Sequence, residues 1–175
     1  SDCLDADDDK RWLVALLSDS GMRLGEAVGL VKSDIILDGD MPHVNISPHA
    51  WRRLKTKGSQ RCVPLVGKAL WAASRAFDGA TGRKFLFPRY NRGSSSNANS
   101  ASAAINKWLK PRVPDNCVIH SFRHSMRDRL RAVECPSDII DAIGGWMTTG
   151  VGQRYGTRQP LEVKAKWMDR LVDQD

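Results

Sequence analysis

Six side chains that can bind phosphate or move protons are spread over five short segments of the chain. Arginine and lysine bind phosphate oxygens, histidine exchanges protons near neutral pH, and tyrosine carries a nucleophilic hydroxyl group. Each segment, taken alone, also has an ordinary structural explanation. The six residues are Arg23, Lys57, His120, Arg123, Trp146 and Tyr155.

Two of the segments place an arginine at or near the start of a predicted helix. Arg23 follows a break at Gly21 and stands between apolar residues, so a buried guanidinium there needs a partner such as Glu26. The alternative is an ordinary intrahelical Arg–Glu pair. His120 and Arg123 lie three residues apart at a helix N-terminus, which is a ready phosphate site. The alternative there is a His-capped helix with a surface arginine.

The remaining segments carry Lys57, Trp146 and Tyr155. Lys57 is expected at the tip of a β-turn between two strands, where most lysines are simply solvated. Trp146 follows Gly145 and is equally explained as a core anchor after a helix C-cap. Tyr155 comes nine residues later and is equally explained as a half-buried aromatic residue. The other tyrosine of the chain, Tyr90, lies in a predicted loop.

The charge of the chain is distributed unevenly. It has 175 residues with 27 Lys and Arg against 20 Asp and Glu, a net charge of +7. Residues 1–40 hold ten acids and four bases, whereas residues 41–114 hold fourteen bases and one acid. Ordinary surfaces mix the two signs, so this stretch predicts a polyanionic partner, most simply DNA or RNA. The candidate contacts are Arg52, Arg53, Lys55 and Arg61.

Composition excludes several classes of protein. The sequence is 41% hydrophobic and 27% charged, which is typical of a folded domain. It contains no run of about 18 apolar residues, so no membrane-spanning helix is expected, and no signal-peptide core is visible near the start. The four cysteines are far apart without a C-x-x-C pair, so we expect reduced thiols, no bound metal and no cofactor.

Periodicity predicts a mostly α fold with a small antiparallel three-stranded β-sheet. Apolar stripes indicate helices over 8–18, 24–30, 68–77, 101–109, 121–133, 138–143 and 160–172. Strands are predicted over 35–37 and 43–46, and residues 50–56 are expected to pair with 61–65 around a turn at 57–59. Residues 78–100 are rich in Gly, Ser and Asn and predict a loop. We expect a single domain over residues 1–175.

In their order and spacing, these segments resemble the tyrosine recombinases, the phage integrase family. Arg23 matches the element T-G-[LM]-R-x-x-E, with Ser20 where Thr is usual. Lys57 matches a hairpin lysine that precedes an R-x-V-P-L strand. His120 and Arg123 match H-x-[LF]-R-H. No single motif is specific, but five in register are.

The resemblance extends from residue 8 to residue 172. Trp146 falls where the family has His or, in a minority, Trp, and Tyr155 lies at the spacing of the nucleophile. The departures are Gly152, where Thr is frequent, and Gly156 after the tyrosine. The resemblance implies the catalytic domain of such a recombinase, with the N-terminal DNA-binding domain of the family lying outside this sequence.

The implied activity is that of a site-specific DNA recombinase that needs no metal. Tyr155 would attack a DNA phosphate and form a 3′-phosphotyrosine intermediate, which a second strand then resolves. Glu26 would orient the arginine three residues before it, and His124 is expected to have a structural role.

The resemblance also assigns roles to the other residues of the site. Arg23 and Arg123 would clamp the scissile phosphate, and His120 would be the general base. Lys57 would be the general acid for the departing 5′ oxygen. Trp146 can only donate through its indole N–H, so it would hold a phosphate oxygen without moving a proton.

The implied partners are double-stranded DNA and further copies of the chain, in a DNA-bound tetramer. The stripe on residues 160–172 would exchange onto a neighbouring copy or pack on its own domain, and both remain open. The expected compartment is the cytoplasm of a prokaryote, at the nucleoid. Three alternatives to a recombinase also remain open: a DNA-binding module that has lost its chemistry, a type IB topoisomerase and a metal-dependent nuclease.

Overall fold

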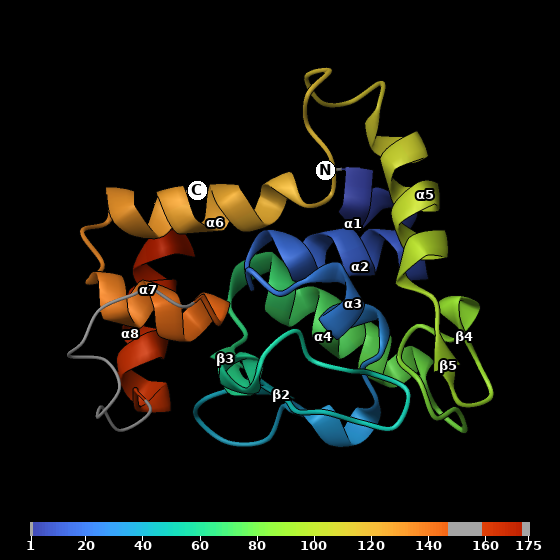
Figure 1. The fold of residues 1–175 in the computed structure, drawn as a ribbon, viewed down its shortest axis with the longest axis horizontal. Helices are drawn as coiled ribbons and strands as arrows, with labels where there is room; N and C mark the ends of the chain where they lie inside the picture. The colour runs from blue at the N-terminus through green and yellow to red at the C-terminus, as the bar shows by residue number, and fades with distance from the viewer. Residues whose placement is uncertain (1, 147–158, 173–175) are drawn as a thin grey trace.

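The structure, a computed structural model, describes residues 2–146 and 159–172 (Figure 1). Tyr155 therefore lies outside the described residues. The predicted class is confirmed, because helices predominate and a small antiparallel sheet of three strands packs among them. Of the helices in the described ranges, none is long and apolar enough to cross a membrane.

The core begins with a pair of packed helices, α2 (Asp9–Ser18) and α4 (Gly67–Gly79). The side chain of Asp8 accepts a hydrogen bond of 3.0 Å from the Arg11 N–H, which caps the start of α2. The buried face of α4 carries only alanines, so the larger side chains of α2 can approach it closely. The short helix α1 (Asp2–Ala6), which the sequence did not predict, precedes α2.

The three-stranded sheet consists of β1 (Ile35–Ile36), β2 (His43–Ile46) and β3 (Arg61–Pro64), in that order. All neighbours are antiparallel, and Val44 is paired with both Ile35 and Val63. The helix α3 (Leu24–Val28) and a 3₁₀ turn, η1 (Lys32–Asp34), lead into the sheet. The apolar residues of the sheet that face inward are fully buried and complete the core beside α2 and α4.

The predicted strand over 50–56 is wrong. The partner of β3 is β2, and residues 47–60 form a long loop with a single bridge between His49 and Arg52. The physical reason is the side chain of Arg52, which is 2% exposed and donates to the carbonyl oxygen of Ser47 in the loop and to that of Glu26 in α3. These side-chain hydrogen bonds hold the loop against α3 in place of pairing between strands. The predicted hairpin turn is instead a 3₁₀ turn, η2 (Lys57–Ser59).

The predicted loop over 78–100 contains short regular elements. A 3₁₀ turn, η3 (Pro88–Tyr90), is followed by the two-stranded hairpin of β4 (Asn91–Arg92) and β5 (Ser95–Ser96). The helix α5 (Ala98–Leu109) then begins three residues earlier than predicted. Its start is fixed by the Asn97 side chain, which accepts a hydrogen bond from the Ser100 N–H.

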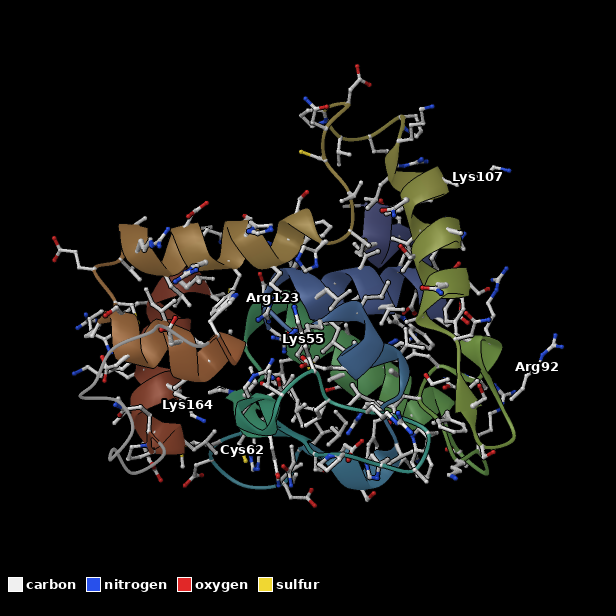
Figure 2. The ribbon with its side chains drawn as sticks, viewed as in Figure 1. Lys55, Cys62, Arg92, Lys107, Arg123 and Lys164 are labelled. Atoms are coloured by element: carbon white, nitrogen blue, oxygen red, sulfur yellow. The ribbon has the colours of Figure 1, made fainter. Side chains whose placement is uncertain are left out.

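The last helices are α6 (Ser121–Ala132), α7 (Ser137–Gly144) and α8 (Leu161–Val172). α8 packs against β3, α6 and α7 of its own chain through Met168 and Leu171, which are buried. Between α8 and β3 the buried ammonium group of Lys164 donates a hydrogen bond to the Cys62 carbonyl oxygen (Figure 2). In this structure, then, the C-terminal stripe packs on its own domain.

Replacing Lys164 with Met should loosen the attachment of α8. The substitution keeps the aliphatic stem but leaves the Cys62 carbonyl oxygen without this donor, so we expect a loss of about 1–3 kcal/mol of unfolding free energy in urea. Lys166→Met, two residues away at an exposed position of α8, is the matched control and should stay within about 0.5 kcal/mol of the parent. Equal stabilities of the two variants would contradict the role of Lys164.

Candidate active site

Arg23 stands at the N-terminus of α3 and is held from three directions. Its Nη1 donates to Glu26 Oε1 at 2.7 Å and to Ser59 Oγ at 3.2 Å, and its Nη2 donates to the Gly145 carbonyl oxygen at 3.2 Å. About a quarter of the side chain remains exposed. The helix start, the turn that bears Lys57 and the segment that bears Trp146 therefore meet at one guanidinium group.

Glu26 lies beneath Arg23 as a buried carboxylate. It is 3% exposed and accepts hydrogen bonds from the backbone and side chain of Arg23 and from the guanidinium group of Arg61. Burial raises the pKa of Glu26, but the charge and hydrogen bonds of Arg61, with those of Arg23, outweigh it and hold the pKa below its usual value. Glu26 is therefore ionised at neutral pH and fixes both arginines.

Arg61 is buried and fully engaged inside the domain. Its Nε donates to the Ile143 carbonyl oxygen at 2.7 Å, and its Nη1 donates to the Ser59 carbonyl oxygen at 2.7 Å. Its Nη2 donates to Glu26 Oε2 at 2.9 Å. A guanidinium group that is buried in this way is not accessible to DNA. Arg61 is therefore a structural residue and not the DNA contact that the sequence predicted.

The same correction applies to Arg52. It pairs with Asp34 at 3.1 Å and donates its other hydrogen bonds to the carbonyl oxygens of Ser47 and Glu26. Burial lowers the pKa of Arg52, although Asp34 acts in the opposite direction. Of the four basic residues expected to bind DNA, only Arg53 and Lys55 have exposed side chains and remain candidates.

Arg123 is a buried arginine in the first turn of α6. It is 4% exposed, and its Nη1 donates to the Gly21 carbonyl oxygen. Its Nη2 is buried and has no hydrogen-bond partner among the described residues. Burial, together with the charges of Arg23 and Arg61, lowers the pKa of Arg123 to about 10.

A hollow of about 120 Å³ opens beside this arginine. An unpaired, buried guanidinium N–H is costly, and an anionic oxygen is the partner that best removes the cost. Apolar and polar residues from α2, α3, α5 and α6 surround the hollow. Its lining comprises Leu17, Met22, Leu24, Ser102, Ile119, His120 and Arg123.

Trp146 packs its ring against the guanidinium of Arg123, whose carbon lies 4.3 Å from the ring centroid. Arg127, one turn along α6, lies 5.2 Å from the same ring. The ring also lies against Gly144, where a Cβ atom would come within 1.8 Å of it. Gly145 has φ of +63° and faces Arg61 so closely that a Cβ atom there would lie 2.8 Å from Nη1.

Arg127 is a member of this cluster that the sequence analysis missed. Its spacing of four residues from Arg123 is a helical signal that would have placed both on one face. It also lies 3.5 Å from the carboxylate of Asp141, on α7.

His120 and His124 stand at the exposed N-terminal end of α6, with their rings 5.2 Å apart and edge to face. Partial burial, followed by the positive neighbours His124 and Arg123, lowers the pKa of His120 below its usual value. His120 is therefore mostly neutral at pH 7 and can accept a proton. His120 and Arg123 both line the hollow of about 120 Å³.

Two of the six predicted site residues cannot be placed by their side chains. Lys57 is described through its backbone only, in η2, between Thr56 and the buried Ser59. Tyr155 lies outside the described residues. The structure thus brings together Arg23, Glu26, Arg123 and Trp146, with His120 at the edge of the group.

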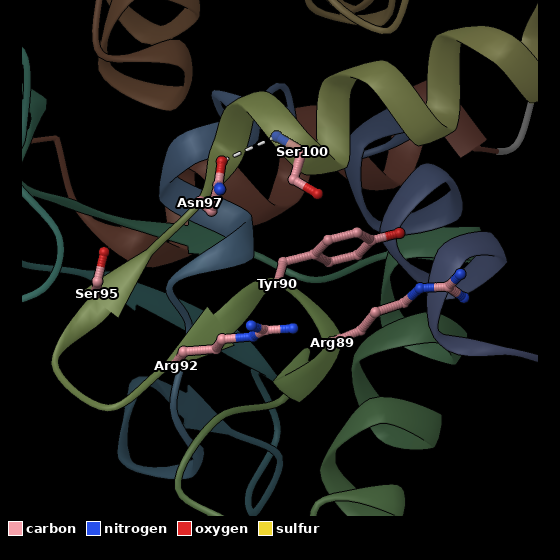
Figure 3. A pocket seen from close by; sticks show the side chains of 6 residues that line it. All are labelled: Arg89, Tyr90, Arg92, Ser95, Asn97 and Ser100. Carbon is pink, nitrogen blue, oxygen red and sulfur yellow. Dashed lines mark hydrogen bonds between the residues drawn. The ribbon is translucent and has the colours of Figure 1, made fainter.

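Tyr90, the other tyrosine, is placed in a separate hollow of about 390 Å³ near the β4–β5 hairpin (Figure 3). Neither Arg23 nor Arg123 lines that hollow. Burial, then the carboxylate of Asp9, raises the pKa of Tyr90, which makes it a poor nucleophile. Among the described residues, no group of three or more His, Cys, Asp or Glu side chains could hold a metal ion.

Comparisons with known proteins bear on the family and the fold of the chain. A family model, described as the phage integrase family, matches residues 3–161. The sequence matches no curated protein. Three solved structures of the Tn1549 transposon integrase in complex with transposon right-end or circular-intermediate DNA are similar in fold, with 16–17% identity and TM-scores of 0.56–0.60. The similarity covers 92–93% of this chain but 58–59% of those proteins.

Sulfate should stabilise the domain through Arg123. Because the buried Nη2 has no partner within residues 2–146 and 159–172, we expect tens of millimolar sulfate to raise the melting temperature by about 2–4 °C over chloride at equal ionic strength. Arg123→Met should abolish this difference, whereas Arg131→Met, at an exposed site on the same helix, should preserve it. A sulfate effect that survives in Arg123→Met would contradict an anion site at this arginine.

The imidazole of His120 should titrate below pH 6.5 in the free domain, which NMR of its ring protons can measure. Replacing His124 with Gln should raise the midpoint, because one of the neighbouring positive charges that oppose protonation is removed. A midpoint above 6.5, or one that does not respond to the substitution, would show that the ring environment differs from the one described.

Proposed function

Because the chain belongs to the phage integrase family, we propose that it is the catalytic domain of a site-specific DNA recombinase that cleaves and rejoins DNA through a 3′-phosphotyrosine intermediate. The observation that carries the proposal is the cluster of guanidinium groups at Arg23 and Arg123. Within this cluster, the buried Nη2 of Arg123 has no hydrogen-bond partner in the described part of the chain. A DNA phosphate supplies the missing oxygen.

The two arginines act as the phosphate clamp. Arg123 lines the hollow beside His120, and its buried Nη2 has no hydrogen-bond partner among the described residues. Arg23 is a quarter exposed, and Glu26 holds it from beneath. Attack on a phosphodiester places additional negative charge on the non-bridging oxygens in the transition state. Preorganised cationic donors stabilise that charge more than they stabilise the ground state, so they lower the barrier.

Tyr155 is the proposed nucleophile and needs help to ionise. An unperturbed phenol has a pKa of about 10, so roughly one in 10³ is ionised at pH 7, a cost of about 4 kcal/mol. His120 is suited to remove the proton, because its lowered pKa keeps it neutral near pH 7. The new bond joins the tyrosine oxygen to phosphorus, and the bond from phosphorus to the 5′ oxygen breaks.

Lys57 is the proposed general acid that delivers a proton to the departing 5′ oxygen. The phosphotyrosine ester retains the energy of the broken bond, so the 5′ hydroxyl group of a second strand can attack it and rejoin the DNA without ATP. Trp146 packs on Arg123 and holds that guanidinium in place. Its indole N–H is a candidate donor to the same phosphate.

We further propose double-stranded DNA as the substrate, with Arg53 and Lys55 among the groups that contact its backbone. The similar solved integrases were determined with DNA, and they are longer than this chain. We therefore propose that the recombinase binds DNA with a further DNA-binding domain as well as with this one.

We also propose that four copies of the protein assemble on the DNA. In such a tetramer α8 would leave its own domain and dock on a neighbouring copy. A protein of this kind acts at the nucleoid, in the cytoplasm.

Relaxation of supercoiled plasmid in EDTA tests the proposed chemistry without knowledge of the target sequence. The parent protein should relax the plasmid and leave a covalent protein–DNA adduct on a denaturing gel. Tyr155→Phe should do neither, because the nucleophilic oxygen is absent. The matched control is Tyr90→Phe, which should retain adduct formation.

The other outcomes separate the alternatives. Adducts that persist in Tyr155→Phe would overturn the assignment of the nucleophile. Nicking that requires a divalent metal would indicate a nuclease, and DNA binding without adducts from any variant would indicate a module that has lost its chemistry. Relaxation by a protein that never assembles beyond a monomer on DNA would favour a type IB topoisomerase.

A further inference from the structure

We infer that Ser59 is a positioning residue for Arg23, so that the turn bearing Lys57 also sets the geometry of the phosphate clamp. A role of Ser59 in DNA cleavage rests on the proposed function. The orientation of the Arg23 guanidinium group by the Ser59 hydroxyl group can be tested by anion binding, without DNA cleavage.

Ser59 uses all of its polar atoms inside the site. It is fully buried, and its hydroxyl oxygen lies 3.2 Å from Arg23 Nη1 and 3.0 Å from the hydroxyl group of Thr56. Its N–H donates to the Thr56 carbonyl oxygen at 3.0 Å, and its own carbonyl oxygen accepts from Arg61 at 2.7 Å. A hydroxyl group so enclosed has no access to solvent, and its position is set by the backbone of η2.

Arg23 needs this second contact because Glu26 alone does not define its orientation. Of the guanidinium nitrogens, only Nη1 donates to the Glu26 carboxylate, and Nη2 donates to the Gly145 carbonyl oxygen at 3.2 Å, the same distance as that from Nη1 to the Ser59 hydroxyl oxygen. Nη1 is thus shared between Glu26 and Ser59. Without the hydroxyl group, Nη1 keeps Glu26 as its one acceptor and Nη2 keeps Gly145, so the partly exposed guanidinium is held less firmly in the orientation that binds the anion.

The loop around Ser59 is anchored independently of its hydroxyl group. Arg52 fixes residues 47–52 to η1 and α3, and the contact of Arg61 with the Ser59 carbonyl oxygen survives any change of side chain. Ser59→Ala should therefore leave the backbone of the loop in place. This separates a positioning effect on Arg23 from a general loss of structure.

The first test measures sulfate binding from the shift in melting temperature with sulfate concentration, in the intact chain. Ser59→Ala should weaken sulfate binding by about threefold to tenfold, because Arg23 is no longer aimed at the anion. Thr56→Val is the matched control. It removes the other partner of the same hydroxyl group but leaves the Ser59–Arg23 contact, so sulfate binding should change by less than about twofold.

A double-mutant cycle shows whether Ser59 acts through Arg23. In an Arg23→Gln background, Ser59→Ala should have no further effect on sulfate binding, because the group it positions is already absent. An equal effect of Ser59→Ala in both backgrounds would overturn the inference. So would an unchanged sulfate affinity in the single variant.

Plasmid relaxation then separates this inference from the proposed function. With an active parent, Ser59→Ala should slow relaxation by about tenfold to a hundredfold while the affinity for DNA stays unchanged. Unchanged relaxation would overturn the catalytic meaning of Ser59. An inactive parent would instead contradict the proposed function, and the sulfate cycle would still decide whether Ser59 positions Arg23.

Discussion

The buried carboxylate of Glu26 is the interaction on which the remaining geometry of the site depends. It accepts from Arg23 at the start of α3 and from Arg61 at the start of β3. Arg61 in turn holds the carbonyl oxygens of Ser59 and Ile143. Buried ion pairs contribute little net stability, because desolvation offsets their attraction. The consequence of this pair is geometric: one carboxylate sets the relative positions of segments that are far apart in sequence.

Positive charge exceeds negative charge around that carboxylate. Arg23, Arg61, Arg123 and Arg127 surround the site, and burial, followed by the charges of the other arginines, lowers the pKa of Arg123. Such an arrangement costs folding free energy, and Nη2 of Arg123 has no hydrogen-bond partner in the part of the chain that the structure describes. An anion that enters the hollow removes the repulsion and fills the missing hydrogen bond at the same time.

The sequence predicted the fold class and most of the helices, because their apolar periodicity is strong. It failed where a charged side chain replaces backbone pairing, as Arg52 does in the loop over 47–60. The burial of Arg61 had a readable signal, since alternation in β3 puts it on the same face as the fully buried Val63. Arg52 offered no such signal. Its basic neighbours made it look like part of a solvated surface, and only the fold shows that it points inward.

The candidate site could be predicted as a set of residue types but not as a set of contacts. Spacing located Arg123 and Trp146, whereas the stacking of one on the other depends on the close approach at Gly144 and the positive φ of Gly145. Arg61 fixes the same turn through the Ile143 carbonyl oxygen. Arg23 also reaches this turn, because its Nη2 donates to the Gly145 carbonyl oxygen. Any shift of the turn would therefore change the cover of Arg123 and the hold on Arg23 together, so the two arginines are coupled through one turn even though they come from separate motifs.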